Sequence, residues 1–129
     1  MKSLIIKQSG IREYDTDERC HIKELLNGDE DPGLSFALAR VKPGVTTVLH
    51  SLKGTSERYL VISGEGVMEV GTLPPAPVGP GDLVLIPPDT PQRITNDGSE
   101  DLVFCCICTP GFEPSVYVDL EKPGSEKPE

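Results

Sequence analysis

Two stretches of the chain decide its fold. The first runs from Gly44 to Gly64 and reads GVTTVLHSLKGTSERYLVISG. The second runs from Gly81 to Asn96 and reads GDLVLIPPDTPQRITN. In both, short apolar or alternating segments are bounded by Gly and Pro, a pattern that is typical of β-strands joined by tight turns. We expect Gly44, Gly64 and Gly81 to occupy turns that need a positive φ.

Polar side chains in these stretches recur at spacings that place them together. His50 and Leu52 are two residues apart, so their side chains share one face of a strand. Glu57 begins the next expected strand and shares its inner face with Tyr59. Gln92 begins a later strand, and in a closed barrel His50, Glu57 and Gln92 would converge on one point, as a binding or metal site requires.

The spacing of both stretches resembles the two signature motifs of the cupin superfamily. The first motif runs Gly, five residues, His-x-His, three or four residues, Glu, six residues, Gly. The second runs Gly, five residues, Pro-x-Gly, two residues, His, three residues, Asn. The resemblance covers 53 residues directly. It implies an all-β fold, the double-stranded β-helix or jelly-roll cupin barrel.

The chain departs from the motifs at two ligand positions. In cupins of the usual kind, three His and one Glu surround Fe, Mn, Ni or Zn. Here Leu52 and Gln92 stand where two of the three His are expected, and only His50 and Glu57 are kept. Three interpretations stay open: a divalent transition metal held by His50, Glu57, Gln92 and waters; a metal-free pocket for a small molecule; and a structural barrel with a satisfied polar cluster.

Two function hypotheses follow from this altered site. The first is a metal-dependent enzyme of dioxygenase, isomerase or lyase type that acts on a small organic substrate, with Glu57 and Tyr59 as candidate catalytic residues. The alternative is a metal-free binding module without turnover, for a sugar or a small carboxylate. Arg40 would serve as an anion anchor if its side chain pointed inwards.

Composition bounds the class of protein and its partners. The chain has 129 residues, a net charge of −9 and 26% charged residues, a profile of one soluble domain. This charge argues against nucleic acid and against an anionic membrane surface as partners. The chain has no apolar run of transmembrane length and no apolar region of a signal peptide near Met1, so we expect a cytoplasmic protein.

The pattern of turns predicts a strand order and domain limits. We expect an N-terminal arm at 1–19, the barrel at 20–112, and a partly disordered C-terminal tail at 113–129. Strands are expected at 20–26, 34–41, 45–52, 57–62, 67–70, 83–86, 92–95 and 102–108. The Pro-rich segment 73–77 is expected to be a surface loop, since Pro gives no hydrogen to a ladder. Tyr117, Val118 and Leu120 could dock on the barrel.

The strand at 102–108 also contains three of the four cysteines. Neighbouring residues point to opposite faces, so Cys105 and Cys106 cannot both face a pocket. Cys106 and Cys108 are expected either as core thiols or as thiols beside the pocket, and their role stays open.

Leu60 and Ile62 are apolar and, by the alternation of side chains along their strand, point outwards. Together with the resemblance, this predicts a homodimer.

Overall fold

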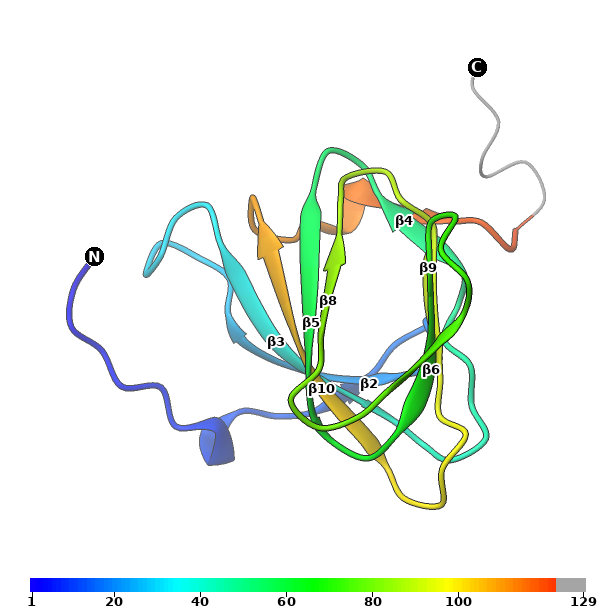
Figure 1. Ribbon diagram of the computed structural model, residues 1–129. Helices are drawn as coiled ribbons and strands as arrows, with labels where there is room; N and C mark the ends of the chain where they lie inside the picture. The colour runs from blue at the N-terminus through cyan, green and yellow to red at the C-terminus, as the bar shows by residue number, and fades with distance from the viewer. Residues whose placement is uncertain (123–129) are drawn as a thin grey trace.

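The computed structural model describes residues 1–122 and consists of two antiparallel β-sheets that face each other and enclose a barrel (Figure 1). One sheet contains, in spatial order, β1 (Tyr14–Asp15), β2 (His21–Leu26), β3 (Ser35–Val41), β10 (Leu102–Thr109), β5 (Ser56–Ser63) and β8 (Leu83–Ile86). The other contains β11 (Tyr117–Asp119), β4 (His50–Leu52), β9 (Gln92–Thr95), β6 (Gly66–Val70) and β7 (Ala76–Val78). Short 3₁₀ turns are formed by Gln8–Gly10 and Pro114–Val116. This arrangement confirms the predicted double-stranded β-helix.

Strands distant in the sequence pair within each sheet. β10 lies between β3 and β5, with Cys106 opposite Ala37 on one side and Tyr59 on the other. In the second sheet, β9 lies between β4 and β6, and His50 pairs directly with Gln92. These long-range pairings place the residues of both sequence stretches, 44–64 and 81–96, around one barrel interior.

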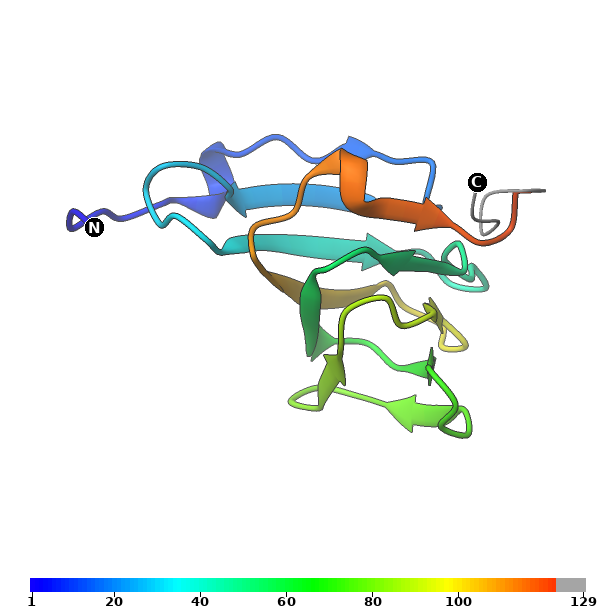
Figure 2. The same cartoon turned by 90° about the horizontal axis from the view of Figure 1, so that it is seen from above.

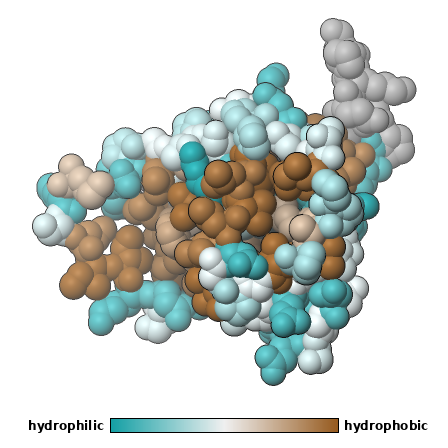
Figure 3. Space-filling view, viewed as in Figure 1, coloured by the Kyte–Doolittle hydropathy of each residue, from teal (hydrophilic) through white to brown (hydrophobic). Residues whose placement is uncertain are grey.

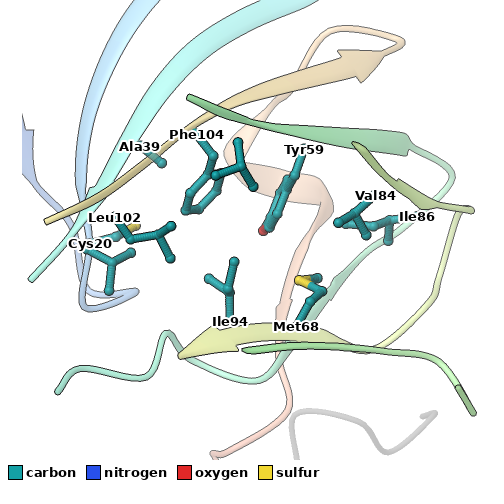
Figure 4. Close-up of a cluster of buried hydrophobic side chains, with 11 residues drawn as sticks. Cys20, Ala39, Tyr59, Met68, Val84, Ile86, Ile94, Leu102 and Phe104 are labelled. Carbon is teal, nitrogen blue, oxygen red and sulfur yellow. The ribbon is translucent and has the colours of Figure 1, made fainter. Parts of the chain in front are cut away.

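Side chains alternate along β5 as the sequence predicts. Glu57, Tyr59 and Val61 are buried, whereas the residues between them point outwards. Figure 4 shows Tyr59 and Phe104 directed from one sheet towards Ile94 and Met68 of the other. The rings of Tyr59 and Phe104 lie with their centroids 4.4 Å apart. Their contact marks the boundary between the packed end of the barrel and its open end.

The packed end is filled by aliphatic side chains from both sheets. Its members include Val61, Met68, Val84, Ile86, Ile94, Leu102 and Phe104. The turn after β5 closes this end, and Gly64 adopts a φ of +84° there. A Cβ at this position would lie 2.4 Å from the carbonyl oxygen of Asp101, so only glycine fits. Gly44 and Gly81 also have positive φ, as expected.

Two expected elements differ from the sequence prediction. The strand expected at 45–52 is a strand only at His50–Leu52. The preceding residues bond to separate partners, with the Thr47 amide donating to Ile94 and the Val48 amide to Glu18, so no continuous ladder forms. The expected loop at 73–77 ends in the strand β7, which among residues 1–122 pairs with β6 alone. Pro77 is tolerated because an edge strand has one side without a ladder.

Both terminal segments join the barrel. β1, within the expected arm, pairs with β2, and β11, within the expected tail, pairs with β4. The prediction that Tyr117 and Val118 dock is thereby confirmed, whereas the disorder predicted for the end of the chain falls mostly outside the described residues. Residues 1–7, before the 3₁₀ turn at Gln8–Gly10, extend away from the barrel in both views (Figures 1 and 2). Among residues 1–122, no helix has the length and apolarity needed to cross a membrane.

Candidate functional site

A cavity of about 550 Å³ occupies the open end of the barrel. Its wall combines the inner faces of β2, β3, β5 and β10 with β4, β11 and the segment that precedes β2. Three of the residues singled out by the sequence, His50, Glu57 and Tyr59, lie on this wall, as does Leu52. Gln92 is not part of it, although its side chain is completely buried nearby.

Gln92 is held beneath the cavity by Tyr59. The Tyr59 hydroxyl donates a hydrogen bond of 2.7 Å to Gln92 Oε1. The Gln92 Nε2 group has no hydrogen-bond partner among the described residues. Burial raises the pKa of the Tyr59 hydroxyl well above its ordinary value, so this group stays protonated at neutral pH. Tyr59 therefore orients the amide whose oxygen the metal hypothesis needs as a ligand.

Glu57 is the most unusual group on the wall. Its residue is 7% exposed, and its Oε1 atom has no hydrogen-bond partner among residues 1–122. The thiol of Cys108 lies 3.7 Å from Oε2. Burial raises the pKa of the Glu57 carboxyl to about 7, while the nearby Gln92 amide opposes this rise and the Glu18 carboxyl adds to it. Glu57 can therefore gain and lose a proton near neutral pH, which suits an acid–base role.

His50 lies on the cavity wall in the sheet opposite that of Glu57, and its environment favours the neutral imidazole. Burial lowers its pKa below the ordinary value. Its Nδ1 atom lies 2.7 Å from the carbonyl oxygen of Val48. Since a carbonyl only accepts hydrogen bonds, Nδ1 must carry the proton, and Nε2 is left as an acceptor. The ring stacks on Tyr117 with centroids 4.8 Å apart, which fixes its plane.

The cysteines beside the cavity are unreactive thiols. All four cysteines of the chain are free, and Cys106 and Cys108 line the cavity as one of the two interpretations expected. Burial raises the pKa of the Cys108 thiol to about 12 and that of Cys106 well above its ordinary value. Because the thiolate is the reactive form, neither is prepared to act as a nucleophile.

The comparisons with known proteins agree with the fold. The family model described as "Cupin domain" matches residues 37–108 of the chain. The chain is a cupin. An uncharacterized protein of Methanocaldococcus jannaschii, MJ1618, is 33% identical over 124 residues, which is 94% of this chain and 95% of that protein.

Solved structures show the same barrel. A predicted oxalate decarboxylase from Thermotoga maritima has a TM-score of 0.75 at 23% identity, over 83% of this cupin and 99% of that chain. The Streptomyces nucleoside dehydratase Pac13 has a TM-score of 0.72 at 20% identity, over 92% of each chain. At these identities the likeness establishes the fold alone.

The donor groups of this cupin do not fit a tightly held transition metal. His50 Nε2 and one oxygen of Glu57 are available, but Leu52 offers no ligand and Gln92 Oε1 already accepts a hydrogen bond from Tyr59. Within residues 1–122, no group of three or more His, Cys, Asp or Glu side chains is arranged to hold a metal ion. Protein metal sites of this type use three or four such donors. The metal set His50, Glu57 and Gln92 remains a prediction that the donor geometry does not favour.

Several residues of the cupin pocket come from the terminal segments, among them Glu18 and Tyr117. Glu18 lies on the wall, partly buried, and burial raises the pKa of its carboxyl to about 7. It is held there by its neighbour Arg19, which bonds to the backbone of Thr46 and to Glu121. Sequence reasoning missed Glu18 because it precedes the first long strand, where no periodicity indicates which side chains face inwards. Tyr117 was expected to dock, but nothing local showed that it would stack on His50.

Basic side chains of the barrel strands point away from the cavity. Arg40 lies on the outer face and forms ion pairs of 2.6 Å with Glu13 and 3.0 Å with Asp101. The hypothesis of Arg40 as an inward anion anchor is therefore wrong, because the inner face of β3 is formed by the alternate residues, such as Ala37 and Ala39. Arg93 likewise pairs with Glu69 on the outer surface.

Proposed function

We propose that this cupin is an enzyme that transfers a proton on a small organic substrate without a metal, of the isomerase or lyase type. The observation that carries this proposal is Glu57, whose buried carboxyl has an unpartnered oxygen and a pKa near 7 beside a large cavity. An unpartnered buried carboxyl costs stability, and such groups persist where a function requires them.

Glu57 would act first as a base and then as an acid. Its carboxylate removes a proton from a carbon next to a carbonyl group of the substrate, and the electron pair of the C–H bond moves into the enolate. The carboxylic acid that results returns the proton. It goes to a neighbouring atom in an isomerisation, or to a departing hydroxyl group, released as water, in an elimination.

Three neighbours support this reaction in different ways. His50 Nε2 accepts a hydrogen bond from a substrate hydroxyl and so orients it. Tyr59 is a positioning residue, because its hydroxyl holds Gln92. Gln92 Nε2 has a free hydrogen close to Glu57, where it can stabilise the carboxylate.

The names of two structural neighbours fit a lyase and leave the substrate open. Pac13 is called a nucleoside dehydratase and the Thermotoga protein a predicted oxalate decarboxylase, and both activities are lyase reactions. The alternative hypothesis, a binding module without turnover, uses the same cavity. Of the two ligand classes it includes, a small carboxylate is disfavoured by the acidic wall that Glu18 and Glu57 form.

Solvent hydrogen exchange tests the proposal. The protein is incubated in D₂O with a panel of small ketones and β-hydroxy ketones in the presence of a chelator, and loss of the α-hydrogen is followed by NMR. We expect at least one member to exchange, at a rate about 100-fold lower in Glu57→Gln. Glu100→Gln, an exposed change of the same kind, should exchange like the parent. Exchange that disappears with the chelator, or that survives Glu57→Gln, would refute the proposal, and binding without any exchange would support the binding module.

We also propose that the protein forms a homodimer through the outer face of the larger sheet. Ile62, Leu83 and Leu85 are 49%, 60% and 66% exposed there. Figure 3 shows hydrophobic side chains gathered over β5 and β8 and along the N-terminal segment, which includes the exposed Leu4 and Ile5. Apolar surface of this kind marks interfaces between proteins.

A cytoplasmic location stays a prediction.

A further inference from the structure

Acidic residues that range from exposed to almost fully buried line the cavity. Asp17 and Glu24 lie at exposed positions on the wall, whereas Glu18 is partly buried and Glu57 is almost fully buried. Asp119 and the basic Lys122, both engaged in interactions of their own, complete the set of charged wall residues. The cavity therefore has a strong excess of carboxyl groups over cationic groups, and such a cleft concentrates cations.

Two polar atoms on the cavity wall, Glu57 Oε1 and His50 Nε2, can accept hydrogen bonds from a ligand. Glu57 Oε1 is buried and has no partner among the described residues. His50 Nε2 is an acceptor, because Nδ1 carries the proton that binds the Val48 carbonyl. A ligand that satisfies both atoms must bring its own hydrogens. An ammonium group brings three N–H donors and a positive charge.

The remaining wall is apolar and aromatic. Leu52 is buried, the ring of Tyr117 lies parallel to that of His50 at an interplanar angle of 19°, and Phe112 lines the cavity as well. Apolar walls suit the carbon body of a ligand, and aromatic rings attract cations. Burial keeps the Glu57 carboxyl partly protonated when the cavity is empty, and a cation next to it would favour the ionised form.

We propose that the cavity binds a small organic ammonium ion, with its charged group between Glu18 and Glu57 and its apolar body against Leu52 and Tyr117. This inference rests on the proposed function, because it names the substrate class for the same pocket. Binding and turnover are measured separately, so either proposal can fail alone. The charged group adds to the reaction by holding the substrate in one orientation relative to Glu57.

A matched set of three ligands tests the charge preference. The probes are 2-phenylethylamine, 2-phenylethanol and phenylacetate, which share an aromatic body and differ in charge. Calorimetry at pH 8, in buffer with EDTA, should give the amine an affinity about tenfold or more above that of the alcohol, and the weakest binding to phenylacetate. Equal affinities, tighter binding of phenylacetate, or no binding of any of the three would overturn the inference.

Charge-removing variants locate the binding site. Glu18→Gln and Glu57→Gln should each weaken binding of 2-phenylethylamine about tenfold and leave the affinity for 2-phenylethanol within twofold. Glu100→Gln removes the same charge at an exposed position outside the cavity, and should leave amine binding unchanged. Thermal unfolding of each variant confirms that it is folded. Amine binding that is as tight in both cavity variants as in the parent would overturn the proposed position of the ammonium group.

Discussion

The hydroxyl of Tyr59 donates a 2.7 Å hydrogen bond to Oε1 of Gln92, from one sheet of the barrel to the other. The bond has two consequences. It occupies Gln92 Oε1, the oxygen that a metal ion would need. It also leaves Gln92 Nε2 without a partner among the described residues and close to the Glu57 carboxyl. Gln92 stands at a motif position where a metal ligand is expected, and here its amide lies next to the Glu57 carboxyl.

Loss of this hydrogen bond should destabilise the fold. Tyr59→Phe keeps the ring against Phe104 but leaves Gln92 Oε1, which is fully buried, without its donor. The cost of an unsatisfied buried acceptor is about 1–3 kcal/mol. Urea unfolding measures it, with Tyr14→Phe as the control, because Tyr14 is 43% exposed and its change should cost under about 0.5 kcal/mol. Equal stability of both variants would show that the bond does not hold the two sheets.

Because the Glu57 carboxyl is buried, the free energy of unfolding should fall as pH rises. The pKa of its carboxyl is about 7 in the folded protein, against 4.5 as its ordinary value. Between these two pH values the folded state keeps a proton that the unfolded state has lost, so the free energy of unfolding falls as pH rises through this window. The difference of roughly 2.5 pKa units corresponds to about 3 kcal/mol.

The variant Glu57→Gln isolates that effect. Between pH 5 and pH 8, the parent protein should lose about 2.5 kcal/mol more stability than Glu57→Gln, measured by urea unfolding at each pH. Glu100→Gln serves as the matched control and should follow the parent, because it removes an exposed carboxyl. A parent protein that loses no more stability than Glu57→Gln over this range would mean that Glu57 is ionised throughout.

The sequence predicts the barrel and one half of the pocket, for reasons of local geometry. Residues two apart on a strand share a face whatever surrounds them, so the inward positions of Glu57 and Tyr59 follow from parity alone. The same parity places Cys106 and Cys108 on one face. Because β4 begins only at His50, the length of that strand could not be predicted in the same way.

The other half of the pocket depends on contacts between distant segments. Glu18 faces the cavity because Arg19 fastens its segment to Thr46 and to Glu121, which lies 102 residues away. Tyr117 stacks on His50 because β11 pairs with β4. No pattern within either segment contains this information, and only the assembled barrel provides it. The sequence shows that Gln92 replaces a metal ligand of the motif, but it does not show that Gln92 accepts a hydrogen bond from Tyr59.

Disruption of the apolar outer face should separate the proposed dimer. Leu85→Glu places a charge on an edge strand at a position that is 66% exposed in the single chain. If this face is an interface, burial of the charge is unfavourable and the mass by light scattering should fall from twice 13.9 kDa to one chain. Leu73→Glu, on the loop before β7 with 67% exposure, is the control and should keep the dimer mass. A monomeric parent would end the proposal.

The exchange reaction should follow the ionisation of Glu57. As a base, Glu57 is active only as the carboxylate, so the rate should rise from pH 5 to pH 8 with a midpoint near 7, the pKa to which burial raises it. Burial lowers the pKa of His50 below its ordinary value, which favours the neutral imidazole. The Glu18 carboxyl also titrates near pH 7 and raises the pKa of Glu57, so the midpoint belongs to both groups.

Glu18→Gln should therefore move the midpoint of the rate profile to lower pH by a fraction of a unit. Asp17→Asn, a change at the exposed neighbouring residue, should not move the midpoint. A midpoint unaffected by Glu18→Gln would mean that the two carboxyls do not interact, and a rate that falls with rising pH would mean that Glu57 reacts in its protonated form.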